Sequence, residues 1–115
     1  MKVKIYHNPR WGKSRNSVRI LEENKVEYEV IEYLKTPLRK DEIKKILQIL
    51  GVKAKGIVRV SEGDFIENNL DEVLDDDEKM IDAIAQYPKI MERPIIINQS
   101  RGVIGRPPEK ILEII

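Results

Sequence analysis

The residues best suited to chemistry lie near the N-terminus, between a short alternating segment and a predicted helix. Residues 6–16 read Tyr-His-Asn-Pro-Arg-Trp-Gly-Lys-Ser-Arg-Asn. These cations, amides and hydroxyls can bind a small anion, and backbone amides at a helix start add donors that the helix dipole favours. The stretch therefore predicts an anion-binding loop, in which Ser14 caps the helix and Asn8 bonds to the loop backbone.

Residue 11 lies where such a loop would present a nucleophile, and it is tryptophan. An indole ring offers one N–H donor and no lone pair suited to attack. The chain holds no cysteine, so thiol chemistry, disulfides and thiolate metal sites are all excluded. Because His7 is the single histidine, we expect no metal site and no bound cofactor.

The composition is that of an ordinary globular protein, with 41% apolar and 36% charged residues in a chain of 115. The 21 lysines and arginines are matched by 20 acidic residues, which removes the electrostatic basis for general nucleic-acid binding. Its apolar runs are too short to span a bilayer, and the N-terminus does not resemble a signal peptide. We expect one cytoplasmic domain over residues 1–115 that binds neither nucleic acid nor membrane.

The hydrophobic pattern predicts the order of the elements. Strands over 2–6 and 26–33 are joined by a helix from residue 13 or 14 to about 24, which makes a parallel βαβ unit. A helix over 41–50 follows and ends at Gly51. Its N-terminus is unusual, because Arg39 stands three residues ahead of Glu42, where serine or threonine would complete a capping box.

The rest of the chain predicts a helical insert and a C-terminal hairpin. Residues 52–87 show short helical pieces and no strand, the clearest piece beginning at the acids of 75–78. Strands over 95–97 and 103–104 pair antiparallel, and a last helix buries three apolar residues: Ile111, Leu112 and Ile115. The order is βαβ, helical insert, ββα, an α/β fold with a four-stranded mixed sheet.

That order is thioredoxin-like, and the residues resemble one family in particular. Five blocks are similar, in register, to the glutaredoxin-linked arsenate reductases of the ArsC family: residues 7–16, 31–37, 57–59, 88–95 and 105–109. The resemblance covers essentially the whole chain, and several separated blocks in register are far more specific than any one of them.

The resemblance implies a mechanism and a set of site residues. In that family a cysteine at the position of Trp11 attacks arsenate through its thiolate, and glutathione with glutaredoxin as reductant completes the reduction to arsenite. By the same resemblance Arg59, Arg93 and Arg106 bind the oxyanion, and His7 helps to keep the thiol ionised.

Taken singly, each arginine has an ordinary interpretation. Arg59 is also typical of a solvated cation on an amphipathic helix, and Arg106 of a loop cation near the last helix. A cation directly before a buried strand, as Arg93 is, usually has a partner. The Arg93–Pro94 bond is a candidate for a cis peptide, which this fold commonly places opposite the active loop.

Trp11 leaves two arrangements open: its ring points away from the loop, or it stacks on the arginines and fills the anion site. In both we expect an inactive oxyanion-binding homologue that binds arsenate, phosphate or sulfate, with glutaredoxin as a further partner. A mutated enzyme, a natural member that lost catalysis and a designed sequence are all compatible with this tryptophan.

An alternative from another class is an Spx-like protein-interaction and transcription-regulatory module. Such regulators often sense redox state through a Cys-x-x-Cys pair. The matching positions here are Trp11 and Ser14, so redox sensing is excluded. The presence of Arg59, Arg93 and Arg106 favours an arsenate reductase relative over an Spx-like regulator.

Overall fold

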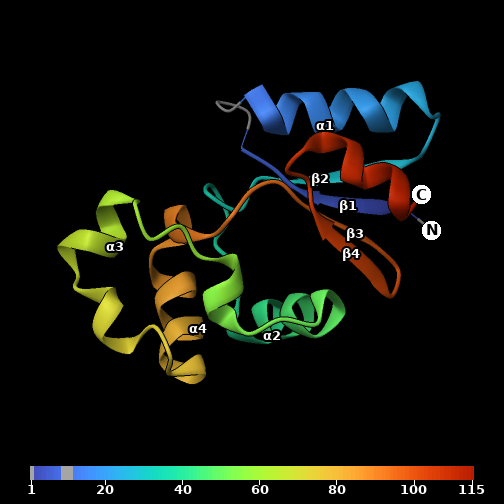
Figure 1. Ribbon diagram of the computed structural model, residues 1–115. Coiled ribbons are helices and arrows are strands. Elements are labelled where there is room, and N and C mark those ends of the chain that lie inside the picture. The colour runs from blue at the N-terminus through green and yellow to red at the C-terminus, as the bar shows by residue number, and fades with distance from the viewer. Residues whose placement is uncertain (1, 9–11) are drawn as a thin grey trace. The chain divides into compact units, whose positions relative to one another are not determined.

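The structure is a computed structural model that describes residues 2–8 and 12–115. The chain divides into two compact units, one formed by Met1–Lys35 with Arg93–Ile115 and the other by Thr36–Glu92. The first unit holds the sheet and the second is helical (Figure 1). The expectation of one domain over the whole chain stays a prediction.

The first unit is built on a sheet of four strands in the order β2-β1-β3-β4. The strands are β1 (Val3–Tyr6), β2 (Tyr28–Ile31), β3 (Ile95–Asn98) and β4 (Arg101–Ile104). β1 runs parallel to β2 and antiparallel to β3, and β3 pairs antiparallel with β4. The predicted mixed sheet and the parallel βαβ unit are therefore confirmed.

The second strand is shorter than the predicted span of 26–33. Lys25 has a positive φ of 56°, so the chain is still turning there. At the other end the Tyr33 N–H donates to the Ile31 carbonyl oxygen at 3.1 Å, which turns the chain away from β1. Both ends of the alternating segment thus belong to turns.

Two helices cover one face of this sheet: α1 (Gly12–Glu23) and the 3₁₀ helix η4 (Pro108–Glu113), drawn blue and red in Figure 1. The apolar side chains between them and the sheet form one buried cluster: Val3, Ile5, Leu21, Ile96, Ile111 and Ile114. The alternation of β1 and the helical spacing of α1 place these residues on facing surfaces, as the sequence predicts.

The predicted burial of the last helix was wrong in two places. Leu112 is 52% exposed and Ile115 is 38% exposed, whereas Ile111 and Ile114 are buried. The prediction assumed an α-helical period, but the segment is a 3₁₀ helix with three residues per turn. That period puts residues 111 and 114 on the same side.

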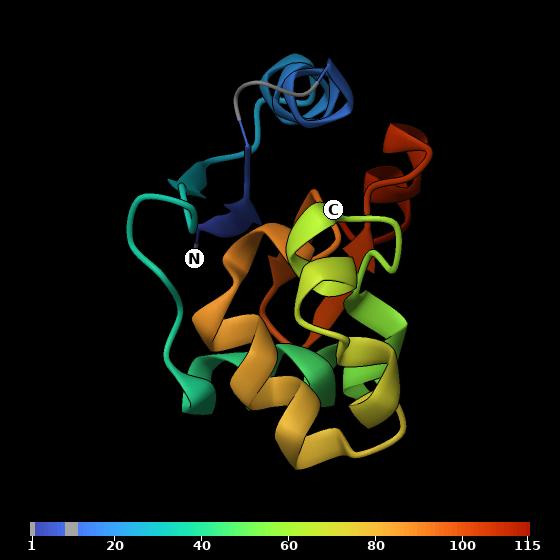
Figure 2. The ribbon, with the colours of Figure 1, turned by 90° about the vertical axis from the view of Figure 1, so that its left-hand side faces the viewer.

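The second unit consists of helices only: α2 (Lys40–Leu50), η1 (Ala54–Ile57), α3 (Gly63–Glu67), η2 (Leu70–Val73), α4 (Asp77–Gln86) and η3 (Pro88–Ile90). α2 packs against α4 (Figure 2). Met80, Ile81 and Ile84 of α4 are buried, as predicted. Throughout residues 36–92, all of which the structure describes, there is no strand, only one isolated antiparallel bridge between Val58 and Met91.

The ends of α2 follow the sequence closely. Gly51 ends it in the left-handed region, with φ at 70°. At the start, the Arg39 N–H donates to Glu42 Oε1 at 3.1 Å, which is one half of a capping box. A guanidinium has no acceptor for the other half, and Arg39 Nη2 donates to Asp41 Oδ2 at 3.4 Å instead.

In residues 2–8 and 12–115, no helix combines the length and the apolar character that crossing a bilayer requires.

Gly105 is closely surrounded by side chains of the first unit. Its N–H donates to the Pro94 carbonyl oxygen at 2.9 Å. A Cβ at this position would lie 2.9 Å from Ile96 Cδ1, 3.0 Å from Pro94 Cγ and 3.0 Å from Ser17 Oγ. The chain leaving β4 can therefore approach β3 and α1 only because residue 105 has no side chain.

We predict that Gly105→Ala lowers the free energy of unfolding by about 1–3 kcal/mol, because the added methyl group overpacks this contact. Gly63→Ala is the matched control, since nothing lies within 4 Å of a Cβ there. Urea unfolding of the three proteins measures the effect. Equal midpoints for Gly105→Ala and Gly63→Ala would contradict the account of the contact.

Candidate functional site

The N-terminal loop is held at both ends by hydrogen bonds. The His7 N–H donates to the Ile31 carbonyl oxygen at 3.0 Å, which continues the pairing of β1 with β2. The Asn8 N–H donates to Ser14 Oγ at 3.4 Å, and both residues are buried. Ser14 therefore lies inside the first turn of α1 and closes the loop from there, so its predicted place as the helix cap was wrong.

Strand register brings Arg93 and Arg106 to the same end of the sheet. The pairs at this end are Tyr6 with Ile95 and Ile95 with Ile104. The hydrogen bond from Gly105 to Pro94 continues the second pairing by one position. Arg93 and Arg106 follow directly beyond these pairs in the sequence, at the end of the sheet where the chain leaves β1. There the Arg106 N–H donates to the Ile104 carbonyl oxygen at 2.8 Å, so the chain turns after β4.

The two arginines share a backbone feature. The Arg93–Pro94 peptide is cis, as predicted, and so is Arg106–Pro107, which the sequence did not lead us to expect. Arg93 is only 6% exposed, and Arg106 is half-buried. Both cations are thus largely removed from water, which sets them apart from most cations of the chain.

Arg59 belongs to the second unit and lies between η1 and α3. Its N–H donates to the Ile90 carbonyl oxygen at 2.7 Å. Its Nη1 lies 3.2 Å from Glu62 Oε2 and its Nε lies 3.9 Å from Glu92 Oε1. The interpretation of Arg59 as a solvated cation on an amphipathic helix was therefore wrong, because it is on no helix and is paired.

Of the predicted site residues, five belong to the first unit: His7, Asn8, Ser14, Arg93 and Arg106. Arg59 is in the second unit, and its convergence with the other arginines stays a prediction. Trp11, the position of the family nucleophile, lies outside the described residues.

His7 is almost completely buried. Desolvation lowers the pKa of its imidazole below the usual 6.5, a shift that Glu32 opposes and Arg15 reinforces. Its Nδ1 has no hydrogen-bond partner in the part of the chain that the structure describes. The imidazole is therefore uncharged at neutral pH and adds no cation to the loop.

In residues 2–8 and 12–115, no group of three or more histidine, aspartate or glutamate side chains gathers as metal ligands would.

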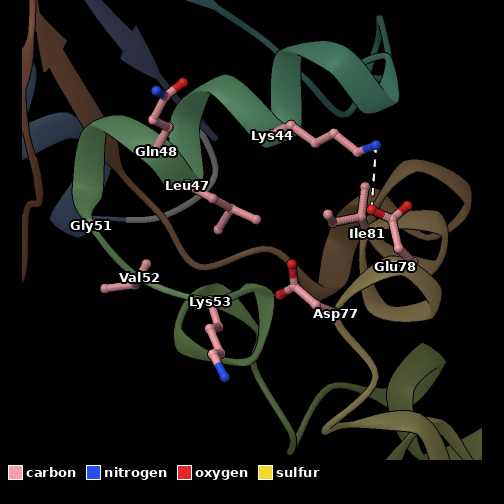
Figure 3. A pocket seen from close by; sticks show the side chains of 9 residues that line it. All are labelled: Lys44, Leu47, Gln48, Gly51, Val52, Lys53, Asp77, Glu78 and Ile81. Atoms are coloured by element: carbon pink, nitrogen blue, oxygen red, sulfur yellow. Dashed lines mark ion pairs between the residues drawn. The ribbon is translucent and has the colours of Figure 1, made fainter.

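The second unit also contains a surface hollow of about 480 Å³ between α2, η1 and α4 (Figure 3). Its charged groups already form interactions within the second unit. Lys44 Nζ lies 3.4 Å from Glu78 Oε1, and Asp77 Oδ1 accepts a hydrogen bond from the Ala54 N–H at 2.8 Å. None of the predicted site residues lines it.

Sequence reasoning missed the two carboxylates next to Arg59. Glu62 carries a weak signal, because a spacing of three residues allows an ion pair with Arg59. Glu92 carries none, because its contact depends on the bridge between Val58 and Met91. Only the folded chain shows that both carboxylates face the same guanidinium.

Comparison with known proteins assigns the chain to a family. The sequence pattern of the ArsC family matches residues 6–114, and the chain belongs to this family. It is 45% identical to the uncharacterized protein YfgD of Escherichia coli K12, over 98% of this chain and 96% of that protein. It is 40% identical to an arsenate reductase of Neisseria meningitidis serogroup A, over 95% and 94% of the two chains.

Solved structures agree with this assignment. An arsenate reductase from Vibrio cholerae superposes with a TM-score of 0.94 and 38% identity, over 100% of this chain and 98% of that one. The fold is thioredoxin-like, as predicted. The comparisons do not favour the Spx-like alternative. The chain itself has no cysteine, so the nucleophile of the family mechanism is missing.

We predict that His7 makes stability depend on pH. Because its folded pKa is below 6.5, the unfolded chain binds more protons once the pH falls past that value. The free energy of unfolding should therefore be unaffected by His7 above pH 6.5. It should fall as the pH drops from 6.5 toward the folded pKa.

The measurement is urea unfolding of the native protein and His7→Gln at pH 8, 6.5 and 5. The difference between the two proteins removes the contribution of the carboxylates, which titrate in both. We expect the native protein to lose more stability than the variant below pH 6.5. Parallel losses in the two proteins would show that His7 is not buried as described.

Proposed function

We propose that this protein is an oxyanion-binding member of the ArsC family that does not reduce arsenate, because Trp11 replaces the cysteine. The observation that carries the proposal is the strand pairing that puts Arg93 and Arg106 at the same end of the sheet, from which the loop after β1 leaves. Both arginines are partly removed from water, and a bound anion would offset part of that desolvation cost.

The proposed ligand is a tetrahedral oxyanion: arsenate, phosphate or sulfate. Planar guanidinium groups bind such anions through paired, charge-assisted hydrogen bonds. Arg59 is proposed as the third ligand. It is paired with Glu92, and Glu92 directly precedes Arg93 in the chain, which supports this assignment. In this proposal the two units act together as one domain.

The loop before α1 supplies the remaining donors in this proposal. Backbone N–H groups at a helix N-terminus favour an anion, and the helix dipole adds to the attraction. Asn8 and Ser14 are buried, and the hydrogen bond from the Asn8 N–H to Ser14 Oγ holds the first turn of α1 close to the end of β1. Because His7 is uncharged at neutral pH, it would add no positive charge to the site and would contribute only through its packing.

Reduction of arsenate to arsenite needs two electrons, which the family obtains through an arsenic–sulfur adduct that glutathione and glutaredoxin resolve. An indole cannot form that adduct, and no other residue of this chain carries a thiol. Anion binding would therefore persist here without the chemical step. Glutaredoxin would have no adduct to act on.

We predict no arsenate reduction by the native chain in the presence of glutathione and glutaredoxin, measured as arsenite formed over time. Trp11→Cys should gain turnover, because the supporting cations would lower the pKa of the new thiol and hold the anion near it. Trp11→Ser is the matched control and should stay inactive. Turnover by the native chain would refute the mechanism.

We also predict that the native protein binds arsenate, phosphate and sulfate, followed by the fluorescence of Trp11, which is the one tryptophan of the chain. Arg106→Gln should weaken binding by at least about tenfold, since a hydrogen bond to a charged group is lost. Arg93→Lys should also weaken it, because an ammonium group cannot replace a paired guanidinium contact.

The control for this titration is Arg19→Gln, which makes the same charge change at an exposed position of α1. It should leave the affinity nearly unchanged. If Arg19→Gln and Arg106→Gln weaken binding equally, the anion responds to net charge alone, and the proposed site is wrong.

A further inference from the structure

Two exposed apolar residues of the second unit line the same surface hollow. Among the large apolar residues in 2–8 and 12–115, Ile66 and Val60 are the two most exposed, at 61% and 55%. Both line a hollow of about 540 Å³, which we call the α3 hollow. Its lining is completed by Phe65, Asn69, Asp71 and Leu74. All of these residues belong to the second unit.

The α3 hollow has an apolar lining and a fixed backbone. Phe65 is buried and Leu74 is half-buried, so apolar side chains lie beneath the two exposed ones. The turn from α3 into η2 is held by backbone hydrogen bonds, from the Asn69 N–H to the Ile66 carbonyl oxygen and from the Glu72 N–H to the Asn69 carbonyl oxygen. An exposed apolar surface of this kind is typical of a binding site for an apolar group.

The segment that forms the hollow is strongly acidic. Residues 60–78 include nine aspartates and glutamates and no lysine or arginine, although the chain as a whole is nearly balanced. Several of these acids have partners inside the second unit, as Asp75 has in Lys55 and Glu78 in Lys44.

Four acids of this segment belong to the two helices that form the hollow. They are Asp64 and Glu67 of α3 and Asp71 and Glu72 of η2. In the part of the chain that the structure describes, none of the four takes part in an ion pair. The apolar hollow therefore carries a local excess of negative charge.

We propose that the α3 hollow is a docking site for a positively charged segment of a partner protein. The segment inserts a large apolar side chain between Val60 and Ile66 and places lysines or arginines beside the four acids. Charge complementarity of this kind steers association and selects the partner, while the apolar contact supplies affinity. The inference goes beyond the proposed function, because no residue of the proposed anion site lines the hollow.

Charge also argues against two other occupants. In a symmetric dimer the same surface of each copy meets at the interface, so the acids of one copy would face those of the other. Anionic lipid headgroups would be repelled by the same carboxylates. A basic segment of a different protein meets neither obstacle.

The test is a titration of the ¹⁵N-labelled native protein with a helical peptide of leucines and lysines, followed by backbone amide signals. We expect the signals of Val60, Ile66 and Asn69 to shift along one binding curve, while those of α1 stay in place. A second peptide, with glutamate in place of every lysine, should bind at least about tenfold more weakly.

Two pairs of variants separate the apolar and the charged contributions. Ile66→Ser should weaken binding of the leucine–lysine peptide at least about tenfold, whereas Leu112→Ser, at a residue that is 52% exposed in the first unit, should leave it unchanged. Asp71→Asn combined with Glu72→Gln should also weaken binding. Its control is Glu22→Gln combined with Glu23→Gln, which removes two charges from exposed positions of α1.

Each remaining outcome would overturn the inference. It is wrong if the leucine–lysine peptide leaves the hollow's signals unmoved, if both peptides bind equally, or if either variant binds no more weakly than its control. Signals of the hollow that move when the concentration of the protein alone is raised would assign the surface to a second copy instead. A variant that does not fold leaves the comparison of the two peptides on the native protein, which decides by itself.

Discussion

The close approach of Gly105 to Pro94 is the constraint on which the candidate site depends. The hydrogen bond between them extends the pairing of β3 and β4 beyond the regular strands, and the surrounding side chains leave no space for a Cβ. Because pairing continues to this point, Arg93 and Arg106, which follow directly beyond it in the sequence, lie at the same end of the sheet. In the proposed function, this glycine thus helps to bring two cations that are distant in sequence to one anion site.

Under the proposed function, binding and chemistry are separate properties of one fold. Cations, loop amides and a helix start attract an oxyanion whatever residue stands at position 11, because their effect is electrostatic. The chemical step instead depends on one sulfur atom, which this chain lacks. Under the proposed function, the lack of that atom would remove the reaction and leave the reason for binding intact.

The sequence predicted the order and pairing of the elements well, because a period of two in 2–6 and of 3.6 in 41–50 is a direct consequence of burial on one face. It failed where local geometry departs from those periods. Leu112 was misplaced because the last helix is 3₁₀, and the second strand is shorter than predicted at both ends because the chain turns at residues 25 and 33. For the site, the arginines were found by resemblance alone. The contact of Glu92 with Arg59 could not be predicted from the sequence, because it depends on a β-bridge between two distant residues, Val58 and Met91.

The central claim is that Arg59, Arg93 and Arg106 bind one oxyanion together. Its most direct test is an arsenate titration of the ¹⁵N-labelled protein, in which the side-chain Nε–Hε signals of the arginines and the Trp11 indole signal are followed. The account predicts that the three arginine signals shift along one binding curve, while that of the exposed Arg39 stays in place. Three curves with different midpoints, or an equal shift of Arg39, would contradict it.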